Sequence, residues 1–199
     1  MTDHKTILYA LSVGDFRGAE DQMEDFPSKD IKARQRAYEE LFSHASRQEV
    51  ISIMKSCIEA STSVVPFLND ESMDPTVTAY ALESLLPSTY AAVNRLWRTG
   101  YCEDMLPVFY ELDALSIRAE EELFARIFVN TSIDPESYMD FLCDGTATEN
   151  QLLQMTETAN NIPQYVSSLD NEAQERVERL VERSVEAYQK CVSATSKPR

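Results

Sequence analysis

Glycine, proline and long apolar runs are scarce in this sequence, and each scarcity excludes a class of structure. Only 4 of the 199 residues are Gly and 8 are Pro, which is too few for the many turns of a β-rich fold. No run of about 18 uninterrupted apolar residues occurs, so we expect no insertion into a membrane. Residues 1–5 lack a basic region followed by an apolar block, which argues against a secretory signal. The sequence therefore predicts a soluble, cytoplasmic protein.

Residues suited to metal and redox chemistry are also few. The four cysteines follow one another at intervals of 45, 41 and 48 residues: Cys57, Cys102, Cys143 and Cys191. No two are close enough to form a zinc knuckle or a redox motif. Free thiols in a reducing compartment, mostly serving as small core residues, are the simplest interpretation.

No catalytic motif is present either. The sequence has no Gly-rich phosphate loop and no dinucleotide fingerprint. Its only histidines, His4 and His44, lack the Glu-x-x-His spacing of a di-iron site. Glu40 and His44 are one helical turn apart, as expected of a surface pair, and a nucleophilic pair such as Cys57 with His44 would need the fold to bring them together. We therefore predict no enzyme, no catalytic residue, no metal and no cofactor.

Positive charge is missing from long stretches. The formal net charge is -16, from 34 acidic and 18 basic residues, and no Lys or Arg occurs between Arg126 and Arg176. That interval holds nine acids: Asp134, Glu136, Asp140, Asp144, Glu149, Glu157, Asp170, Glu172 and Glu175. Such a surface repels phosphate, so we expect no direct nucleic-acid binding. The acidity fits solubility, attraction to a basic partner, or mimicry of nucleic acid.

Helix signals follow one another along the first half of the chain. Helices are expected at 3–13, 16–26 and 29–44, with Gly14 and Asp15 marking the first corner. Residues 46–49 form a capping box that begins a further helix, which fades near residue 64 before Pro66. Another begins at 74–75, with Pro87 expected to kink or restart it, and ends at Gly100.

The second half continues the same pattern. Apolar residues recur every three or four positions over 105–129, which predicts a long helix with residue 116 as the alternative break. Helices are also expected at 135–143, 149–160 and 171–192, with 163–169 as a short helical turn or loop. The fold class is therefore all-α, with about nine or ten helices as stacked hairpins or an irregular bundle. We expect one domain over 1–199, with two lobes, 1–66 and 74–193, as the alternative.

Two segments resemble the helix-turn-helix unit of tetratricopeptide and pentatricopeptide repeats. Residues 7–19 carry a helix, a Gly-Asp-aromatic corner and then small residues where two helices would touch. Residues 89–100, continuing to 108–112, look similar to a pentatricopeptide hairpin. The resemblance covers about a fifth of the chain and implies stacked helical hairpins. The acidic charge argues against an RNA-reading role.

One cluster of aromatic and basic residues is a candidate binding site. Trp97, the only tryptophan, is flanked by Arg95, Arg98 and Tyr101, and these residue types are enriched at interface hot spots. A core residue at a helix end is the alternative for Trp97. We predict a protein-binding scaffold, adaptor, structural subunit or assembly chaperone, within a larger assembly or with a single partner. An acidic nucleic-acid-mimicking inhibitor and a small-ligand-binding or enzymatic all-α protein are the alternatives.

Overall fold

The fold is all-α, as the helical spacing predicted. The computed structural model describes residues 3–27, 30–68, 70, 72–105, 117–144 and 147–195, and these contain helices and no β-strand. They divide into two compact units, Met1–Leu123 and Phe124–Arg199, which we call unit 1 and unit 2. Within unit 1, the helix before residues 66–74 contacts the π-helical turn and the helix that follow them later in the chain, at residues 81–98. The single domain over 1–199 and the alternative lobes 1–66 and 74–193 stay predictions.

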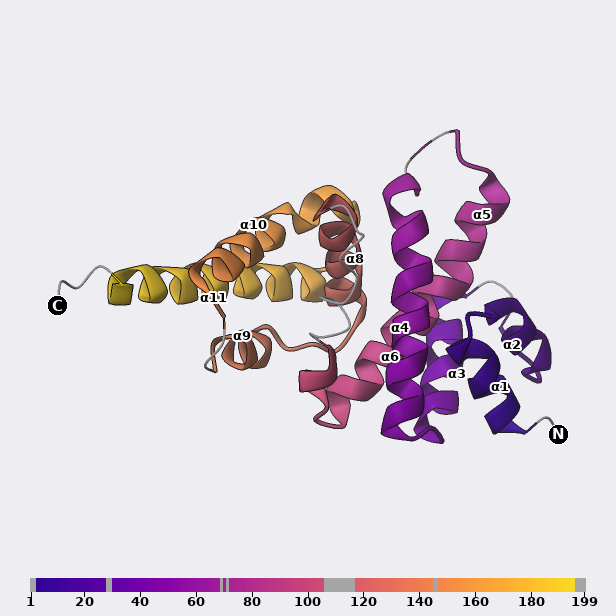
Figure 1. Ribbon diagram of the computed structural model, residues 1–199. Helices are drawn as coiled ribbons and strands as arrows, with labels where there is room; N and C mark the ends of the chain where they lie inside the picture. The colour runs from indigo at the N-terminus through magenta and orange to yellow at the C-terminus, as the bar shows by residue number, and fades with distance from the viewer. Residues whose placement is uncertain are drawn as a thin grey trace. The chain divides into compact units, whose positions relative to one another are not determined.

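Unit 1 is built around its three longest helices, α3, α4 and α6, with α6 packed against the other two (Figure 1). Its elements, in chain order, are α1 (His4–Ser12), α2 (Phe16–Gln22), α3 (Ile31–Ser43), α4 (Arg47–Val64), η1 (Val65–Phe67), α5 (Pro75–Tyr80), η2 (Ala81–Leu85), α6 (Leu86–Arg98) and η3 (Cys102–Asp104). Helix α6 contacts both α3 and α4, and α1 packs on α4 and α2. The core is made by the apolar stripes of these helices, with Leu11, Phe42, Ile53 and Leu96 among its fully buried side chains.

The corner between α1 and α2 forms as its sequence predicted. Gly14 has a φ of +82°, the left-handed conformation that glycine adopts without strain, and so ends α1. The Asp15 carboxylate then accepts a hydrogen bond from the Gly18 backbone N–H at 3.0 Å and caps α2. The packing of α1 on α2 gives a helical hairpin at 4–22.

Pro87 deforms its helix without breaking it. Helices α5 and α6 are continuous through η2, a π-helical turn at Ala81–Leu85. Proline has no N–H, so the Glu83 carbonyl loses its ordinary α-helical donor four residues ahead. Arg34 of α3 replaces that donor, because its Nη1 lies 2.8 Å from the Glu83 oxygen. The π-helical turn before Pro87 is therefore supported by a side chain of a neighbouring helix.

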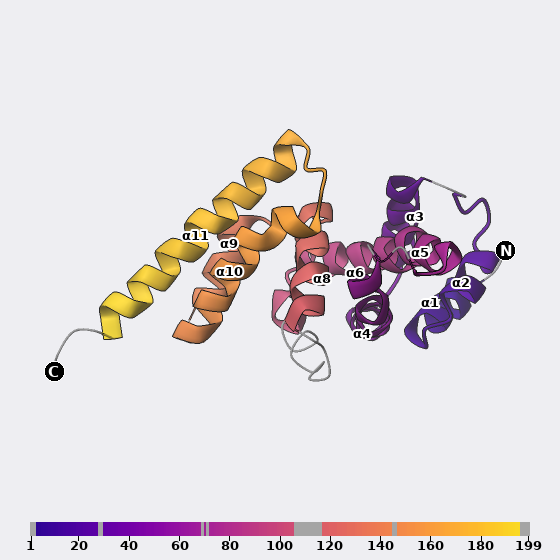
Figure 2. The same ribbon diagram turned by 90° about the horizontal axis from the view of Figure 1, so that it is seen from above.

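The opening of unit 2 is the last part of α8 (Ile117–Asn130), a helix that crosses the division, and three helices follow. These are α9 (Pro135–Cys143), α10 (Glu149–Tyr165) and α11 (Asn171–Thr195). Helices α10 and α11 run side by side, as both views show, and α9 also packs on α11 (Figures 1 and 2). Phe124 lies between Phe128 and Tyr138, with ring centroids 5.9 and 5.8 Å away, and this cluster joins α8 to α9.

Three helix boundaries differ from expectation. Helix α2 ends at Gln22 and not near residue 26, because Met23 is extended and Asp25 takes a positive φ of 57°. Helix α10 continues through Pro163 to Tyr165, where the buried Ile162 keeps its last turn on the core. Part of the long helix expected at 105–129 is α8, and residues 106–116 lie outside the described part of the chain.

Among the residues that the structure describes, one helix passes a length and composition test for membrane spans. The segment Arg47–Phe67, which is α4 with η1, is long and apolar enough to cross a bilayer by those criteria alone. Core helices of globular proteins pass the same test, and α4 packs against α1 and α6. The absence of membrane insertion stays a prediction.

Candidate functional site

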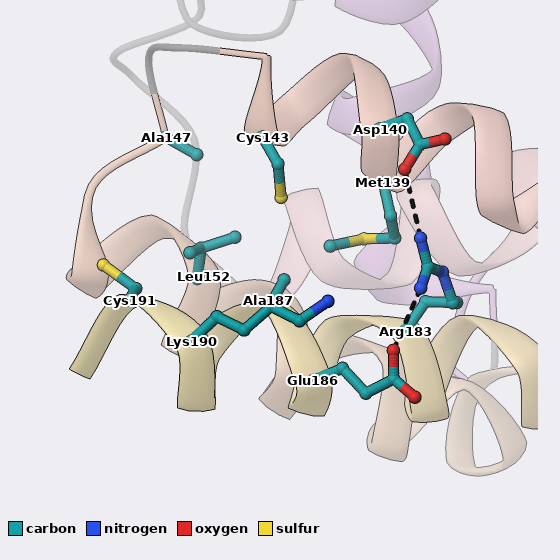
Figure 3. A pocket seen from close by; sticks show the side chains of 10 residues that line it. All are labelled: Met139, Asp140, Cys143, Ala147, Leu152, Arg183, Glu186, Ala187, Lys190 and Cys191. Carbon is teal, nitrogen blue, oxygen red and sulfur yellow. Dashed lines mark hydrogen bonds and ion pairs between the residues drawn. The ribbon is translucent and has the colours of Figure 1, made fainter. Parts of the chain in front are cut away.

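Unit 2 contains a pocket of about 280 Å³ between α9, α10 and α11. It is lined by Met139, Asp140, Cys143, Ala147, Leu152, Arg183, Glu186, Ala187, Lys190 and Cys191. Figure 3 shows Met139, Cys143 and Leu152 facing α11 across the pocket. The site is therefore a hollow with an apolar floor and charged residues at its edge.

Helical spacing places the lining side chains. Met139 and Cys143 are four residues apart on α9 and so share one face. On α11, Ala187 and Cys191 are four apart in the same way, and both have small side chains. These two residues continue the buried face of α11 formed by Ala173, Val177, Leu180 and Ser184. Their small side chains leave space beside α9 and α10. That space is the pocket.

Arg183 joins two elements at the edge of the pocket. Its guanidinium pairs with Asp140 of α9 at 3.1 Å and with Glu186 of its own helix at 2.9 Å, and Figure 3 marks both contacts. All three side chains are at least one-third exposed, so solvent screens these pairs and each contributes little to stability. Lys190 lies beside them and makes no ion pair within the described residues. Since two carboxylates share one guanidinium, the Lys190 ammonium balances the charges at the edge of the pocket.

The Cys143 thiol is not activated as a nucleophile. Partial burial raises its pKa and the Asp140 carboxylate raises it further, whereas Arg183 and Lys190 act in the opposite direction. The thiolate is the reactive form of cysteine, so a raised pKa keeps this group in its unreactive form at neutral pH. The pocket can hold an apolar group, but this thiol is not prepared to attack one.

The predicted binding residues at the end of α6 are tied to their own unit. Arg95 donates to the Ser43 carbonyl at 3.4 Å, and Arg98 lies 3.7 Å from the Glu39 carboxylate. The Tyr101 ring lies 4.3 Å beneath the Arg47 guanidinium. Trp97 is half-buried.

Both roles considered for Trp97, core residue and interface residue, fit that position. The cluster of Arg95, Trp97, Arg98 and Tyr101 stays a predicted partner site.

The other candidate reactive groups are held apart. Cys57 is fully buried, and its Sγ lies 3.3 Å from Ser88 Oγ. Burial raises the pKa of this thiol to about 12. His44 is exposed and stacks on His4, so the fold does not give Cys57 a histidine base. In the described ranges, no group of three or more His, Cys, Asp or Glu side chains is arranged to hold a metal ion.

A second buried polar cluster serves the architecture of unit 1. Arg34, which is 8% exposed, donates to the Pro27 carbonyl at 2.7 Å and lies 3.5 Å from the Glu20 carboxylate. The Tyr38 hydroxyl donates to the same carboxylate at 2.6 Å. Burial, with the charge of Glu20, raises the pKa of Tyr38 and keeps its hydroxyl protonated. The cluster links α2, α3 and η2.

Comparison with known proteins gives no relative. No protein-family model, no curated protein and no solved structure matches the chain. The functional proposal below therefore depends on the geometry of the pocket.

Proposed function

We propose that this protein is a non-catalytic helical protein-binding protein, which acts as a scaffold, adaptor, structural subunit or assembly chaperone. The pocket of unit 2 would receive an apolar side chain of a protein partner. The observation that carries this proposal is an apolar floor, formed by Met139, Leu152 and Ala187, beside charged residues at the edge. Hot-spot side chains in protein interfaces are held in pockets of this kind, surrounded by polar groups that limit access of water.

The size of the pocket favours a side chain over a free small molecule. Its volume of about 280 Å³ lies just below the range of about 300–1,000 Å³ for small-molecule sites. The activated groups that an enzyme needs are not found beside it, since the pKa of Cys143 is raised. A small-ligand site is the second candidate, because two thiols and the Lys190 ammonium line the same hollow.

Mimicry of nucleic acid is less well supported. That function requires carboxylates left free to act as phosphates along one face. Two carboxylates in the acid-only stretch already serve unit 2, since Asp140 pairs with Arg183 and Asp134 caps α9. The acidity is better explained by solubility or by attraction to a basic partner.

The test is to fill the pocket and measure capture of a partner. Tagged wild-type protein is compared with Ala187→Trp, which places an indole where the pocket lies. The matched control is Glu182→Trp, which adds the same group to an exposed position of α11 that does not line the pocket. Partners are captured from the native source and identified by mass spectrometry. A third variant, Arg98→Glu, tests the predicted cluster at the end of α6.

The expected result is one dominant partner that the wild type and Glu182→Trp both capture and that Ala187→Trp loses at least tenfold. Thermal unfolding of both Trp variants should show that they remain folded. Equal capture by all variants would place the interface elsewhere, and loss only in Arg98→Glu would move it to unit 1. If the wild type captures no protein but retains a small molecule that Ala187→Trp does not retain, the result would favour the small-ligand site.

A further inference from the structure

The only two histidines of the chain lie against each other in unit 1. His4 is the first residue of α1, and His44 is the C-cap of α3, 40 residues later. Their ring centroids are 4.7 Å apart and their planes meet at 25°. Both side chains are exposed to solvent. The fold thus brings two accessible imidazoles from distant parts of the sequence into contact.

The backbone beneath both rings is fixed. The Asp3 carboxylate accepts from the Lys5 N–H at 3.2 Å and caps the start of α1. The His44 N–H donates to the Leu41 carbonyl at 3.1 Å and closes the end of α3. Ile7 and Leu41, close by on the same two helices, are buried. The two Cα positions are therefore held by caps and by the core, independently of the rings.

Two imidazoles at this separation can supply two of the ligands of one metal ion. A metal–nitrogen bond is about 2.0–2.1 Å long, so two nitrogens bound to one ion lie within roughly 4.2 Å of each other. The last torsion of histidine has a broad minimum, so the rings can turn from the stack until their nitrogens converge. No third side-chain ligand joins them among the described residues. Water would therefore complete the coordination sphere.

We propose that His4 and His44 form a two-imidazole binding site for a divalent transition metal ion of the class that imidazole prefers: Ni²⁺, Cu²⁺ or Zn²⁺. The ion would link the start of α1 to the end of α3. Mg²⁺ and Ca²⁺, which prefer oxygen ligands, would not bind there. The site lies in unit 1 and does not depend on the pocket of unit 2.

Ni²⁺ is the probe that best isolates this site, because thiolates prefer other ions. The protein carries Cys102→Ser, Cys143→Ser and Cys191→Ser, which removes the thiols that are not fully buried. Two-dimensional ¹H–¹⁵N NMR then shows one set of imidazole signals for each histidine, and Ni²⁺ broadens the signals of any ring that binds it. The variants are His44→Ala and His4→Ala. Glu40→Gln, one helical turn before His44, is the matched control.

The expected result is that Ni²⁺ broadens both imidazoles together, at the same concentrations. In His44→Ala, the His4 signal should require at least tenfold more Ni²⁺, and the reverse should hold in His4→Ala. Glu40→Gln should behave as the wild type. Broadening of one ring alone, or equal Ni²⁺ affinity after removal of His44, would overturn the proposal. Thermal unfolding without metal verifies that each variant is folded.

Discussion

Units 1 and 2 each contain a half-buried or buried arginine that donates to backbone carbonyls of another element, and the two arginines, Arg34 and Arg176, lie in different surroundings. In unit 1, Arg34 donates to the Glu83 carbonyl, which loses its ordinary α-helical donor at Pro87, and it also lies 3.5 Å from the partly buried Glu20 carboxylate. In unit 2, Arg176 of α11 donates to the Phe128 carbonyl at 2.8 Å and to the Ile133 carbonyl at 2.6 Å. These carbonyls lie at the end of α8 and just after it, where donors are lacking.

The difference lies in what each arginine leaves behind when it is removed. Arg34 shares Glu20 with Tyr38, so its loss would leave a carboxylate in a nearly dry site. Arg176 packs over the Phe128 ring at 4.9 Å and is only half-buried, and burial lowers its pKa. Loss of Arg176 would leave uncharged backbone carbonyls, which water can partly reach and hydrate. Removing Arg34 should therefore lower the stability of unit 1 more than removing Arg176 lowers the stability of unit 2.

The largest effect is expected from Arg34→Met. Removing one partner of a buried ion pair typically costs about 3–5 kcal/mol, because the other charge is left uncompensated. Trp97, the only tryptophan, lies in unit 1, so its fluorescence during urea unfolding reports this unit. Arg36→Met is the control, because Arg36 is exposed on the same helix, and we expect it to change stability by no more than about 0.5 kcal/mol. Equal effects of the two substitutions would refute the role given to Arg34.

A smaller effect is expected from Arg176→Met. Three carbonyls, those of Phe128, Val129 and Ile133, lose a donor. All three can recruit water, so the loss should be about 1–3 kcal/mol. Far-UV circular dichroism during urea unfolding reports unit 2 together with unit 1. We expect the circular dichroism transition to shift while the Trp97 transition stays in place. If the two transitions move together, the units unfold as one, and the comparison between them fails as a statement about stability. Arg179→Met, at an exposed position of α11, is the control.

Helix caps should be equivalent in the two units. Asp134 caps α9 by accepting from the Ser137 N–H at 2.9 Å, and Asp30 caps α3 through Lys32 and Ala33. Replacing either by Ala should cost about 1 kcal/mol near pH 7. Urea unfolding measures both changes. If the two replacements lower the free energy of unfolding by amounts that differ more than about twofold, the surroundings of each cap, and not the cap itself, determine the loss.

The Asp134 cap should also depend on pH. The hydrogen bond from the Ser137 N–H lowers the pKa of this carboxyl in the folded protein. Its charge-dependent stabilisation is therefore present above the unfolded value of about 3.9 and is lost as pH falls through the lower, folded pKa. The difference between wild type and Asp134→Asn should shrink below about pH 4 in urea unfolding. A difference that grows on acidification would mean that the sign of this linkage is wrong.

Thiol labelling compares the two units without any mutation, because each unit contains a cysteine of different accessibility. Cys57 in unit 1 is fully buried and its pKa is raised to about 12, whereas Cys143 in unit 2 is exposed. Because the pKa of Cys143 is also raised, labelling is done with iodoacetamide at alkaline pH, where an exposed thiol forms the reactive thiolate. Mass spectrometry should then find Cys143 modified in the native protein and Cys57 modified only after denaturation. Early modification of Cys57 would show that unit 1 opens more readily than its packing indicates.

Local signals in the sequence predicted the helices well but did not predict the sites. Gly14, Asp15 and the capping box at Ser46 act within a few residues, so they could be read directly, and each does what its position predicted. Pro87 predicted a kink or a restart of its helix, but the side-chain donor to the Glu83 carbonyl comes from Arg34, about 50 residues away. No periodicity encodes that contact.

The pocket and the histidine pair were missed for the same reason. The small side chains of Ala187 and Cys191 create a hollow only once α9 and α10 are in place, and no local pattern within α11 encodes that packing. His4 and His44 looked unrelated because their contact depends on α1 lying against α3. The cluster around Trp97 was found because its members are adjacent in sequence, and its role stays a prediction.

The proposed function can be tested most directly by placing a photo-activated cross-linking residue in the pocket. p-Benzoylphenylalanine at position 187 would be activated in the native source and compared with the same residue at position 182, on the exposed part of α11. The proposal predicts one dominant protein adduct from position 187 and little from position 182. Equal adducts from both positions, or none from position 187, would contradict the claim that this pocket receives a partner's side chain.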